Sequence, residues 1–255
     1  MATTVNSEEY NGLTWSEGGN INTTRSKMGA AGSQTAGVIY GGYVSTPVGN
    51  VDVTEEYDGT SWTTSPGTLY EDIAQMASFG TLTTAVMAGG YNYKASPPKA
   101  RAVTQEYNGT TWASNPSPSG DLGAAIYDNS GAGTQTAGLS VGGMSPPSVT
   151  TVDEYNGTTW TEGGSLITAA SVATAAGIQT NAIYSAAPGT ECYGYDGTAW
   201  STRPALGSPR SECGGTNPAP ATSTLVLGGS PSGITTSEEF TGPAETATAS
   251  FITSS

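Results

Sequence analysis

The residues of this chain best suited to acid–base chemistry are pairs of adjacent carboxylates. Paired acids are what glycoside hydrolysis needs, one to donate a proton and the other to act as base or nucleophile. An active site is a single place, however, and these pairs occupy one slot of a segment that the chain repeats. We therefore interpret them as structural groups that solvate a strand or bond to a neighbouring turn. The pairs are Glu8-Glu9, Glu55-Glu56, Asp153-Glu154 and Glu238-Glu239.

Three other acids, Asp72, Asp121 and Asp128, depart from the repeat and are the candidates for a catalytic acid. No cluster of arginines accompanies them, unlike in a sialidase-type site. The chain also has no histidine, which excludes Ser-His-Asp and Cys-His nucleophile systems, histidine bases and the usual zinc or copper ligand sets. We expect a protein that is not an enzyme and that carries no cofactor and no metal.

Binding chemistry has better candidates in three connections, 43–50, 91–99 and 144–149, which are long and unlike one another. Loops that vary over a fixed scaffold are common recognition sites. Their tyrosines and lysine combine aromatic faces with polar donors, which suits a sugar ring. The alternative is that these are ordinary solvated connections. The candidate ligand-binding residues are Tyr91, Tyr93, Lys94 and Tyr43.

The charge of the chain excludes two classes of partner. The formal net charge is −14, from 7 Lys and Arg against 21 Asp and Glu. A nucleic-acid binder needs a basic surface, and so does a protein that binds anionic membranes. No stretch approaches the roughly 18 apolar residues of a membrane span, and the first residues lack the basic and apolar regions of a signal peptide. We expect no nucleic-acid partner, no membrane insertion and synthesis in the cytoplasm without a signal peptide.

An internal repeat defines the elements that must position these residues. Five segments carry a tyrosine, then Asn-Gly or Asp-Gly, then a tryptophan, and successive tryptophans are 40 to 50 residues apart. Every tryptophan stands in this slot. A sixth, weaker copy lies at 237–242. The aromatic anchors are Tyr10 and Trp15, Tyr57 and Trp62, Tyr107 and Trp112, Tyr155 and Trp160, and Tyr195 and Trp200.

Each repeat predicts four short strands. The first is rich in alanine and glycine, the second is apolar and in most copies ends in Gly-Gly, the third ends at the tyrosine, and the fourth carries the tryptophan. Asn-Gly or Asp-Gly predicts a two-residue type I′ turn, which places Tyr57 and Trp62 nearly opposite on one face of a hairpin. That face would pack on the neighbouring repeat, so that five buried indoles supply the core. Such a unit is typical of a β-propeller blade.

The two cysteines fall at different positions of different repeats. Cys192 precedes the tyrosine of a third strand, and Cys213 lies in a first strand. Their Cα atoms are therefore expected to be too far apart for a disulfide, and we expect two buried, inert thiols.

The number of half-repeats predicts how the ring closes. There are five copies of the first two strands but six of the last two, one of them at the N-terminus. We expect a single domain, 1–255, of about five blades, although six is an open alternative. The N-terminal hairpin, 3–17, would complete the last blade by pairing with 209–229. Residues 234–255 would then be a surplus strand region.

The Gly-Gly pairs and the Tyr and Trp positions resemble the kelch family. The tighter pattern, Glu-Glu-Tyr-Asn/Asp-Gly-Thr-x-Trp with Gly-x-Gln-Thr at 32–35, 133–136 and 177–180, is similar to kelch-like proteins encoded by bacteriophages of aquatic bacteria. The resemblance covers the whole chain. It implies a non-enzymatic structural or binding protein of the virion, in the particle or a tail appendage such as a tail fibre, located in the virion and extracellular after lysis.

The resemblance leaves three functions open. In the first, the protein binds other virion proteins and recognises host-surface carbohydrate, with the glycan as ligand. In the second, it assembles with copies of itself into a filament or ring, using the surplus terminal strand for β-augmentation. The third is a carbohydrate-active enzyme that uses Asp72, Asp121 or Asp128.

Overall fold

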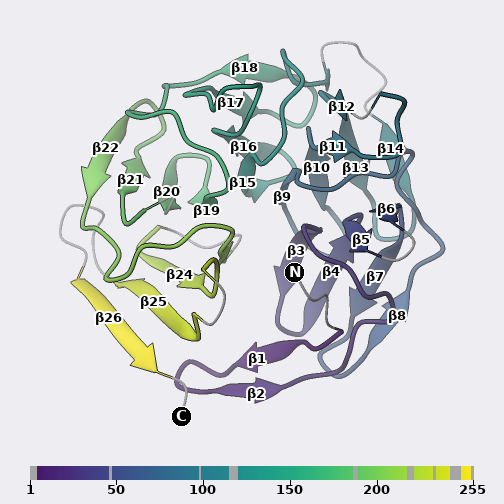
Figure 1. The fold of residues 1–255 in the computed structure, drawn as a ribbon, viewed down its shortest axis with the longest axis horizontal. Helices are drawn as coiled ribbons and strands as arrows, with labels where there is room; N and C mark the ends of the chain where they lie inside the picture. Colours follow the sequence, from purple (N-terminus) through teal and green to yellow (C-terminus); the bar gives the residue numbers. More distant parts are fainter. Residues whose placement is uncertain are drawn as a thin grey trace.

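The computed structural model describes residues 5–45, 48–97, 99–114, 120–185, 189–216, 221–231, 234–241 and 248–253. All named elements in these ranges are β-strands. Five antiparallel sheets of four strands stand around a central axis, with the alanine- and glycine-rich strand of each sheet innermost (Figure 1). The predicted five-bladed β-propeller is confirmed.

The blades follow one another along the chain. Blade one contains β3 (Gly29–Ser33), β4 (Ala36–Tyr40), β7 (Thr54–Tyr57) and β8 (Trp62–Thr64). Blade two contains β9 (Ala77–Phe79), β10 (Val86–Ala88), β13 (Thr104–Tyr107) and β14 (Trp112–Ser114). Blade three contains β15 (Ser130–Thr134), β16 (Ala137–Val141), β17 (Val152–Tyr155) and β18 (Trp160–Glu162). Blade four contains β19 (Thr174–Ile178), β20 (Asn181–Ser185), β21 (Cys192–Tyr195) and β22 (Trp200–Arg203).

The fifth blade corrects the predicted ring closure. It contains β23 (Gly214–Gly215), β24 (Ser223–Leu227), β25 (Thr236–Thr241) and β26 (Thr248–Thr253), so the C-terminal region completes its own blade and is not surplus. The N-terminal hairpin does not join this sheet. Its strands, β1 (Glu8–Tyr10) and β2 (Trp15–Glu17), form a separate two-stranded sheet at the rim, and residues 3 and 4 of the predicted hairpin lie outside the described ranges.

The N-terminal hairpin nevertheless takes part in closing the ring, because it lies between blades five and one (Figure 1). Tyr10 donates to Glu239 at 3.0 Å and the Trp15 indole donates to Ser237 at 3.1 Å, both on β25. From blade one, Tyr57 donates to Glu9, and the Trp62 indole donates to Ser7 at 3.3 Å. The hairpin therefore stands where the outer half of a sixth blade would stand.

The same pair of contacts joins neighbouring complete blades. Tyr155 donates to Glu106 at 2.8 Å, and the Trp160 indole donates to Thr104 at 2.9 Å, both on β13 of the preceding blade. Tyr107 bonds to Glu56 and Tyr195 to Glu154 in the same way. The second acid of each pair thus bonds to the tyrosine of the next blade and not to a turn. The junction between blades four and five lacks this bond, because Gly194 occupies the acid position of blade four and Phe240 occupies the tyrosine position of blade five.

The turn between the last two strands differs from the predicted one. Tyr57 and Trp62 are directly opposite, as predicted, with ring centroids 4.9 Å apart, but four residues connect them. The Asp58 carboxylate accepts the N–H groups of Thr60 and Ser61, both at 2.8 Å, and only Gly59 has a positive φ, of 90°. A side chain that caps two backbone donors replaces the left-handed residue of a type I′ turn. The other four hairpins repeat this geometry.

Burial within the aromatic pairs also differs from the prediction. Trp112 and Trp200 are buried, but Trp15, Trp62 and Trp160 are only partly so. The tyrosines of all four complete pairs in blades one to four are buried. The tyrosine is therefore the deeper anchor, and in blades two to four its hydroxyl bonds to the preceding blade.

One carboxyl group makes the stability of blade three depend on pH. Asp153 lies directly opposite Glu162 in the β17–β18 ladder, and burial, followed by the charge of Glu162, raises the pKa of Asp153 to about 6 from 3.8. The folded protein then binds more protons than the unfolded chain between these two values, so its stability falls as pH rises through that window. Asp153 is partly exposed, and solvent screening limits the effect.

Asp153→Asn is therefore expected to raise the melting temperature at pH 7 by about 1–3 °C and to leave it unchanged near pH 4. Thermal unfolding followed by circular dichroism across this range measures the difference. Glu162→Gln should give a smaller gain of the same sign. A gain that is equal at both ends of the range would show that the ionised carboxylate is not the cause.

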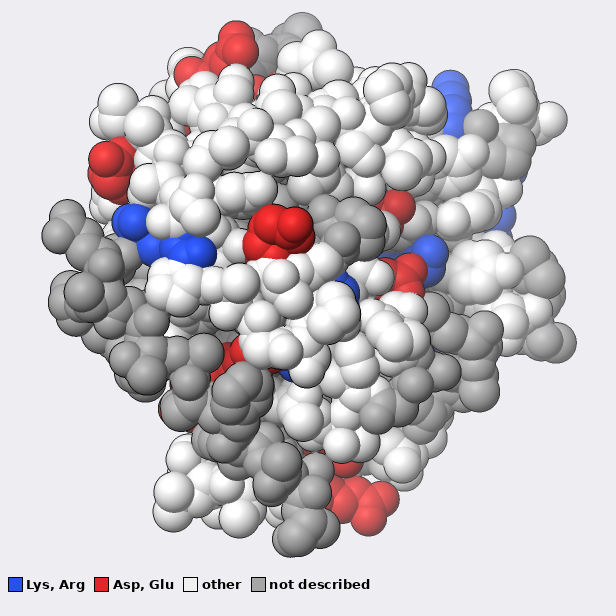
Figure 2. Space-filling view, turned by 60° about the vertical axis from the view of Figure 1, so that its left-hand side comes forward, with Lys and Arg blue, Asp and Glu red and all other residues white. Residues whose placement is uncertain are grey.

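Charged side chains are sparse on the surface. On the face shown in Figure 2, lysine and arginine form isolated spots among uncharged residues, and no continuous basic patch is visible. No helix in the described part of the chain is long and apolar enough to cross a membrane.

Candidate functional site

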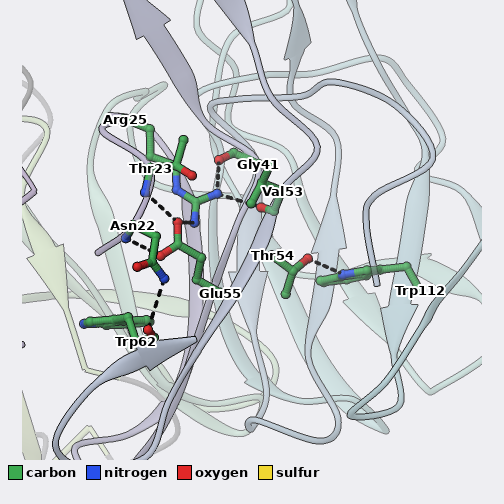
Figure 3. A network of polar contacts seen from close by, with 9 residues as sticks. All are labelled: Asn22, Thr23, Arg25, Gly41, Val53, Thr54, Glu55, Trp62 and Trp112. Carbon is green, nitrogen blue, oxygen red and sulfur yellow. Dashed lines mark hydrogen bonds and ion pairs between the residues drawn. The ribbon is translucent and has the colours of Figure 1, made fainter. Parts of the chain in front are cut away.

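In blades one and five, the first acid of the carboxylate pair forms a buried ion pair with an arginine. Arg25 and Glu55 form an ion pair of 2.8 Å, and both side chains are fully buried (Figure 3). The guanidinium also donates to the carbonyls of Gly41 and Val53, at 3.1 and 2.6 Å. Glu55 accepts two backbone N–H groups, from residues 22 and 23. In blade five, Arg210 and Glu238 form an equally buried pair of 2.7 Å. These acids hold loops onto strands.

The three acids outside the repeat do not converge. Asp72 pairs with Lys94, with 3.1 Å between Oδ2 and Nζ. Asp121 accepts the backbone N–H of Thr104 at 2.9 Å. Of these three acids, Asp128 lines a cavity on the axis of the ring. Among the described residues, no group of three or more His, Cys, Asp or Glu side chains could hold a metal ion.

Three of the four predicted binding residues come together. Tyr43, on β5 (Tyr43–Ser45), directly follows the glycine pair of blade one, and Tyr91, on β11 (Tyr91–Asn92), follows that of blade two. Tyr93 lies between them, with its ring centroid 5.3 Å from that of Tyr43 and 4.7 Å from that of Tyr91. Tyr127 extends the row, with its centroid 4.9 Å from that of Tyr91. We call these four residues the tyrosine row.

Lys94 does not join the tyrosine row. Its ammonium pairs with Asp72, and its methylene chain lies against Gly49, on β6 (Val48–Asn50). The loop turns away after Tyr93 because Asn92 accepts the backbone N–H groups of residues 94 and 95, both at 2.9 Å. The other strand of this small hairpin is β12 (Lys99–Ala100). The structure therefore brings Tyr43, Tyr91 and Tyr93 together and directs the Lys94 ammonium to Asp72.

A ring of five residues with left-handed backbones surrounds the axis beside the tyrosine row. One comes from the start of the inner strand of each blade, with φ between 53° and 62°. Four consecutive backbone bonds link them, from Gln75 N to Lys27 O, Asp128 N to Gln75 O, Val172 N to Asp128 O, and Glu212 N to Val172 O. The junction of blades five and one has a side-chain contact instead, Lys27 Nζ to Glu212 Oε1 at 3.8 Å. We call these five residues the axial ring: Lys27, Gln75, Asp128, Val172 and Glu212.

The axial ring lines a cavity of about 710 Å³ at the mouth of the central channel. A second cavity of about 560 Å³ continues along the inner strands and shares Met28, Met76, Asn129 and Cys213 with the first. The mouth has the size of an ordinary small-molecule site. It lies on the face that carries the long connections, because each inner strand starts on the face where the second strand ends.

Hydrogen bonds join the tyrosine row to the axial ring. The Tyr93 hydroxyl donates to Gln75 Oε1 at 2.6 Å, and Gln75 Nε2 donates to Asp128 Oδ1 at 2.5 Å. Burial, followed by the charge of Asp128, raises the pKa of Tyr93, whose side chain is 37% exposed. Burial also raises the pKa of Asp128, and nearby Glu212 adds to it. The arrangement presents an accessible aromatic ring beside a carboxylate in a cavity.

Sequence reasoning missed Tyr127, Gln75 and the axial ring as a set. Tyr127 stands before an inner strand, not in a long connection, and nothing in its neighbours marks it. The axial ring has no common residue type, since its members include a lysine, a valine and two acids. Only aligning the repeats at the start of the inner strand would have grouped them.

The cysteines behave as predicted toward each other but lie closer than expected. Neither forms a disulfide, yet both contact the same apolar cluster between blades four and five. Cys192 is buried, whereas Cys213 is only partly buried and lines the channel. Burial raises the pKa of each thiol to about 11, which keeps the reactive thiolate rare at neutral pH.

Comparison with known proteins identifies the fold and nothing more specific. No protein-family model matches the chain, and no curated protein matches it. Among solved structures, YjhT, a kelch-repeat β-propeller, superposes with a TM-score of 0.77 over 98% of this chain and 98% of that chain, at 13% sequence identity. The phage resemblance is not tested by this match. The chain therefore has the fold of a kelch-like β-propeller with five blades.

Proposed function

We propose that this protein is a non-enzymatic binding protein that recognises glycan through the tyrosine row, as part of a phage particle or tail appendage. The binding role is supported by geometry. The role in a virion rests on the sequence resemblance described above, and with it the location in the virion and contact with other virion proteins.

One observation carries the binding proposal: the hydroxyl of Tyr93, a partly exposed ring, donates to Gln75, which lines a 710 Å³ cavity. A ring fixed in this way loses little conformational freedom when a ligand stacks on it. A sugar offers an apolar ring face to the tyrosine and hydroxyls to the side chains of the axial ring. Few polar groups at fixed places beside an aromatic wall are typical of small-molecule sites.

The two competing functions receive less support. Self-assembly was expected to use a surplus C-terminal strand. That region forms β25 and β26, which pair within blade five. Catalysis would need two cooperating groups, and Asp72, Asp121 and Asp128 each have a different partner.

Tyr93→Ala is expected to weaken glycan binding about tenfold or more, the cost of truncating an aromatic contact residue. A glycan array finds the ligand, and calorimetric titration with that ligand measures the loss. Tyr70→Ala is the matched control, since Tyr70 is a 64% exposed tyrosine outside the tyrosine row. An array with no bound glycan, or equal binding by both variants and the parent, would contradict the proposal.

A further inference from the structure

We propose that the mouth cavity selects glycans with a free primary amine, whose ammonium group binds between the carboxylates of Asp128 and Glu212 while its sugar ring lies against Tyr93. This inference rests on the proposed function and adds the charge class of the ligand. It excludes uronic and sialic acids, which carry a carboxylate.

The two carboxylates have unused acceptor capacity. Asp128 and Glu212 both line the mouth, from blades three and five. Asp128 Oδ1 accepts from Gln75, and its Oδ2 accepts no hydrogen bond within the described chain. Within the described residues, the Glu212 side chain has one polar contact, with Lys27 Nζ at 3.8 Å, which is beyond hydrogen-bond length. Three of these four oxygens are therefore available to an N–H donor from a ligand.

The charge of the mouth favours a cation. Among the residues of the axial ring, Lys27 is the single positive charge against two carboxylates. Burial raises the pKa of Asp128, the hydrogen bond from Gln75 and the charge of Lys27 lower it, and Glu212 raises it, so that burial and Glu212 disfavour the ionised form. A bound ammonium would offset both effects, and a bound anion would increase them.

An organic ammonium suits this place better than a metal ion. Calcium takes about six to eight oxygen ligands, and a rigid row of tyrosine rings supplies none of that coordination. The described residues also hold no group of three or more acidic or sulfur ligands. An ammonium needs only two or three acceptors and gains further from the faces of nearby aromatic rings. Tyr93 is linked to the Asp128 carboxylate through the Gln75 side chain, and Tyr127 directly precedes Asp128 in the sequence.

The test uses three trisaccharides of equal length: a glucosamine trimer, its N-acetylated counterpart and a glucuronic acid trimer. Calorimetric titration is done slightly below neutral pH, where a carboxylate is ionised and the amine protonated. We expect the glucosamine trimer to bind about tenfold more tightly than the acetylated trimer, and the glucuronic acid trimer to bind most weakly. Asp128→Asn and Glu212→Gln should each reduce the preference for the amine several-fold while leaving the affinity for the acetylated trimer unchanged.

Asp128→Asn is suited to this test because asparagine tolerates the left-handed backbone, with φ of 53° at this position, and keeps the acceptor for Gln75. Glu17→Gln, at an exposed position of β2, controls for the loss of one charge elsewhere. Equal affinity for the amine and acetylated trimers, or tighter binding of the glucuronic acid trimer, would overturn this inference and leave the glycan-binding function standing. A protein that binds none of the trimers and no glycan of the array would contradict the proposed function itself, and this inference with it.

Discussion

Arg25→Met should lower the free energy of unfolding by about 3 kcal/mol, because it leaves the Glu55 carboxylate buried without its counter-charge. The methionine also leaves the carbonyls of Gly41 and Val53 without the donor that each now has at 3.1 and 2.6 Å. Glu55 keeps two backbone N–H donors, which limits the loss. Denaturant unfolding followed by tryptophan fluorescence measures the difference.

The matched control is Lys94→Met, which breaks a pair of similar length between side chains that are 50% and 30% exposed. An exposed pair contributes about 0–1 kcal/mol, so this variant should be nearly as stable as the parent. Similar, small losses in both variants would show that burial of the Arg25–Glu55 pair has no special cost.

The repeat supplies a second test of the same idea. Blade two places Ile73 and Gln105 in the slots that Arg25 and Glu55 occupy in blade one, and both are buried there. The double variant Arg25→Ile, Glu55→Gln should therefore regain much of the stability lost in Arg25→Met, because no charge remains buried at this site in blade one.

The blades could be predicted from sequence because one hairpin is repeated. A tyrosine and a tryptophan on opposite strands bury most of the apolar surface of each unit, as the pair Tyr107 and Trp112 illustrates with 0% and 4% exposure. The closure could not be predicted in the same way. Two hairpins, at 8–17 and 236–253, could each pair with β24. The hairpin at 236–253 does so, although its sequence motif is the weaker of the two.

The reason is chain connectivity. A short connection, 228–235, joins β24 to β25, whereas the N-terminal hairpin lies about 200 residues away along the chain. Closing the short loop costs less entropy, so the sequence copy that lacks a tryptophan still completes the blade. The N-terminal hairpin, which has both Tyr10 and Trp15, then uses them to join two finished blades.

The site could be predicted only in part for a related reason. Tyr43, Tyr91 and Tyr93 stand out because they interrupt variable connections, but the axial ring is defined by backbone geometry. Lysine, glutamine, aspartate, valine and glutamate adopt the same left-handed conformation there because hydrogen bonds between blades impose it. A backbone conformation imposed by these hydrogen bonds does not require a common residue type, so the sequence does not reveal it.

Removal of residues 1–17 is the sharpest test of how the ring is closed. The truncated chain loses five hydrogen bonds that the hairpin makes to blades five and one. Four of them join partly buried groups and are worth about 1 kcal/mol each, so we expect a loss of about 4 kcal/mol in the free energy of unfolding. Hydrogen–deuterium exchange should become faster in β7, β8 and β25, which face the hairpin, and stay unchanged in β16 and β17 on the far side of the ring.

A double variant, Tyr10→Phe with Trp15→Phe, separates closure from mere loss of chain. It keeps an aromatic ring at both positions but removes the two donors to Glu239 and Ser237, so about half of the loss should appear, and exchange should rise in β25 more than in β7. If the truncated chain instead unfolds like the parent, and its exchange is unchanged throughout, five complete blades close by themselves. The contacts among Lys27, Glu212 and their neighbours at the axis would then suffice to hold blade five against blade one.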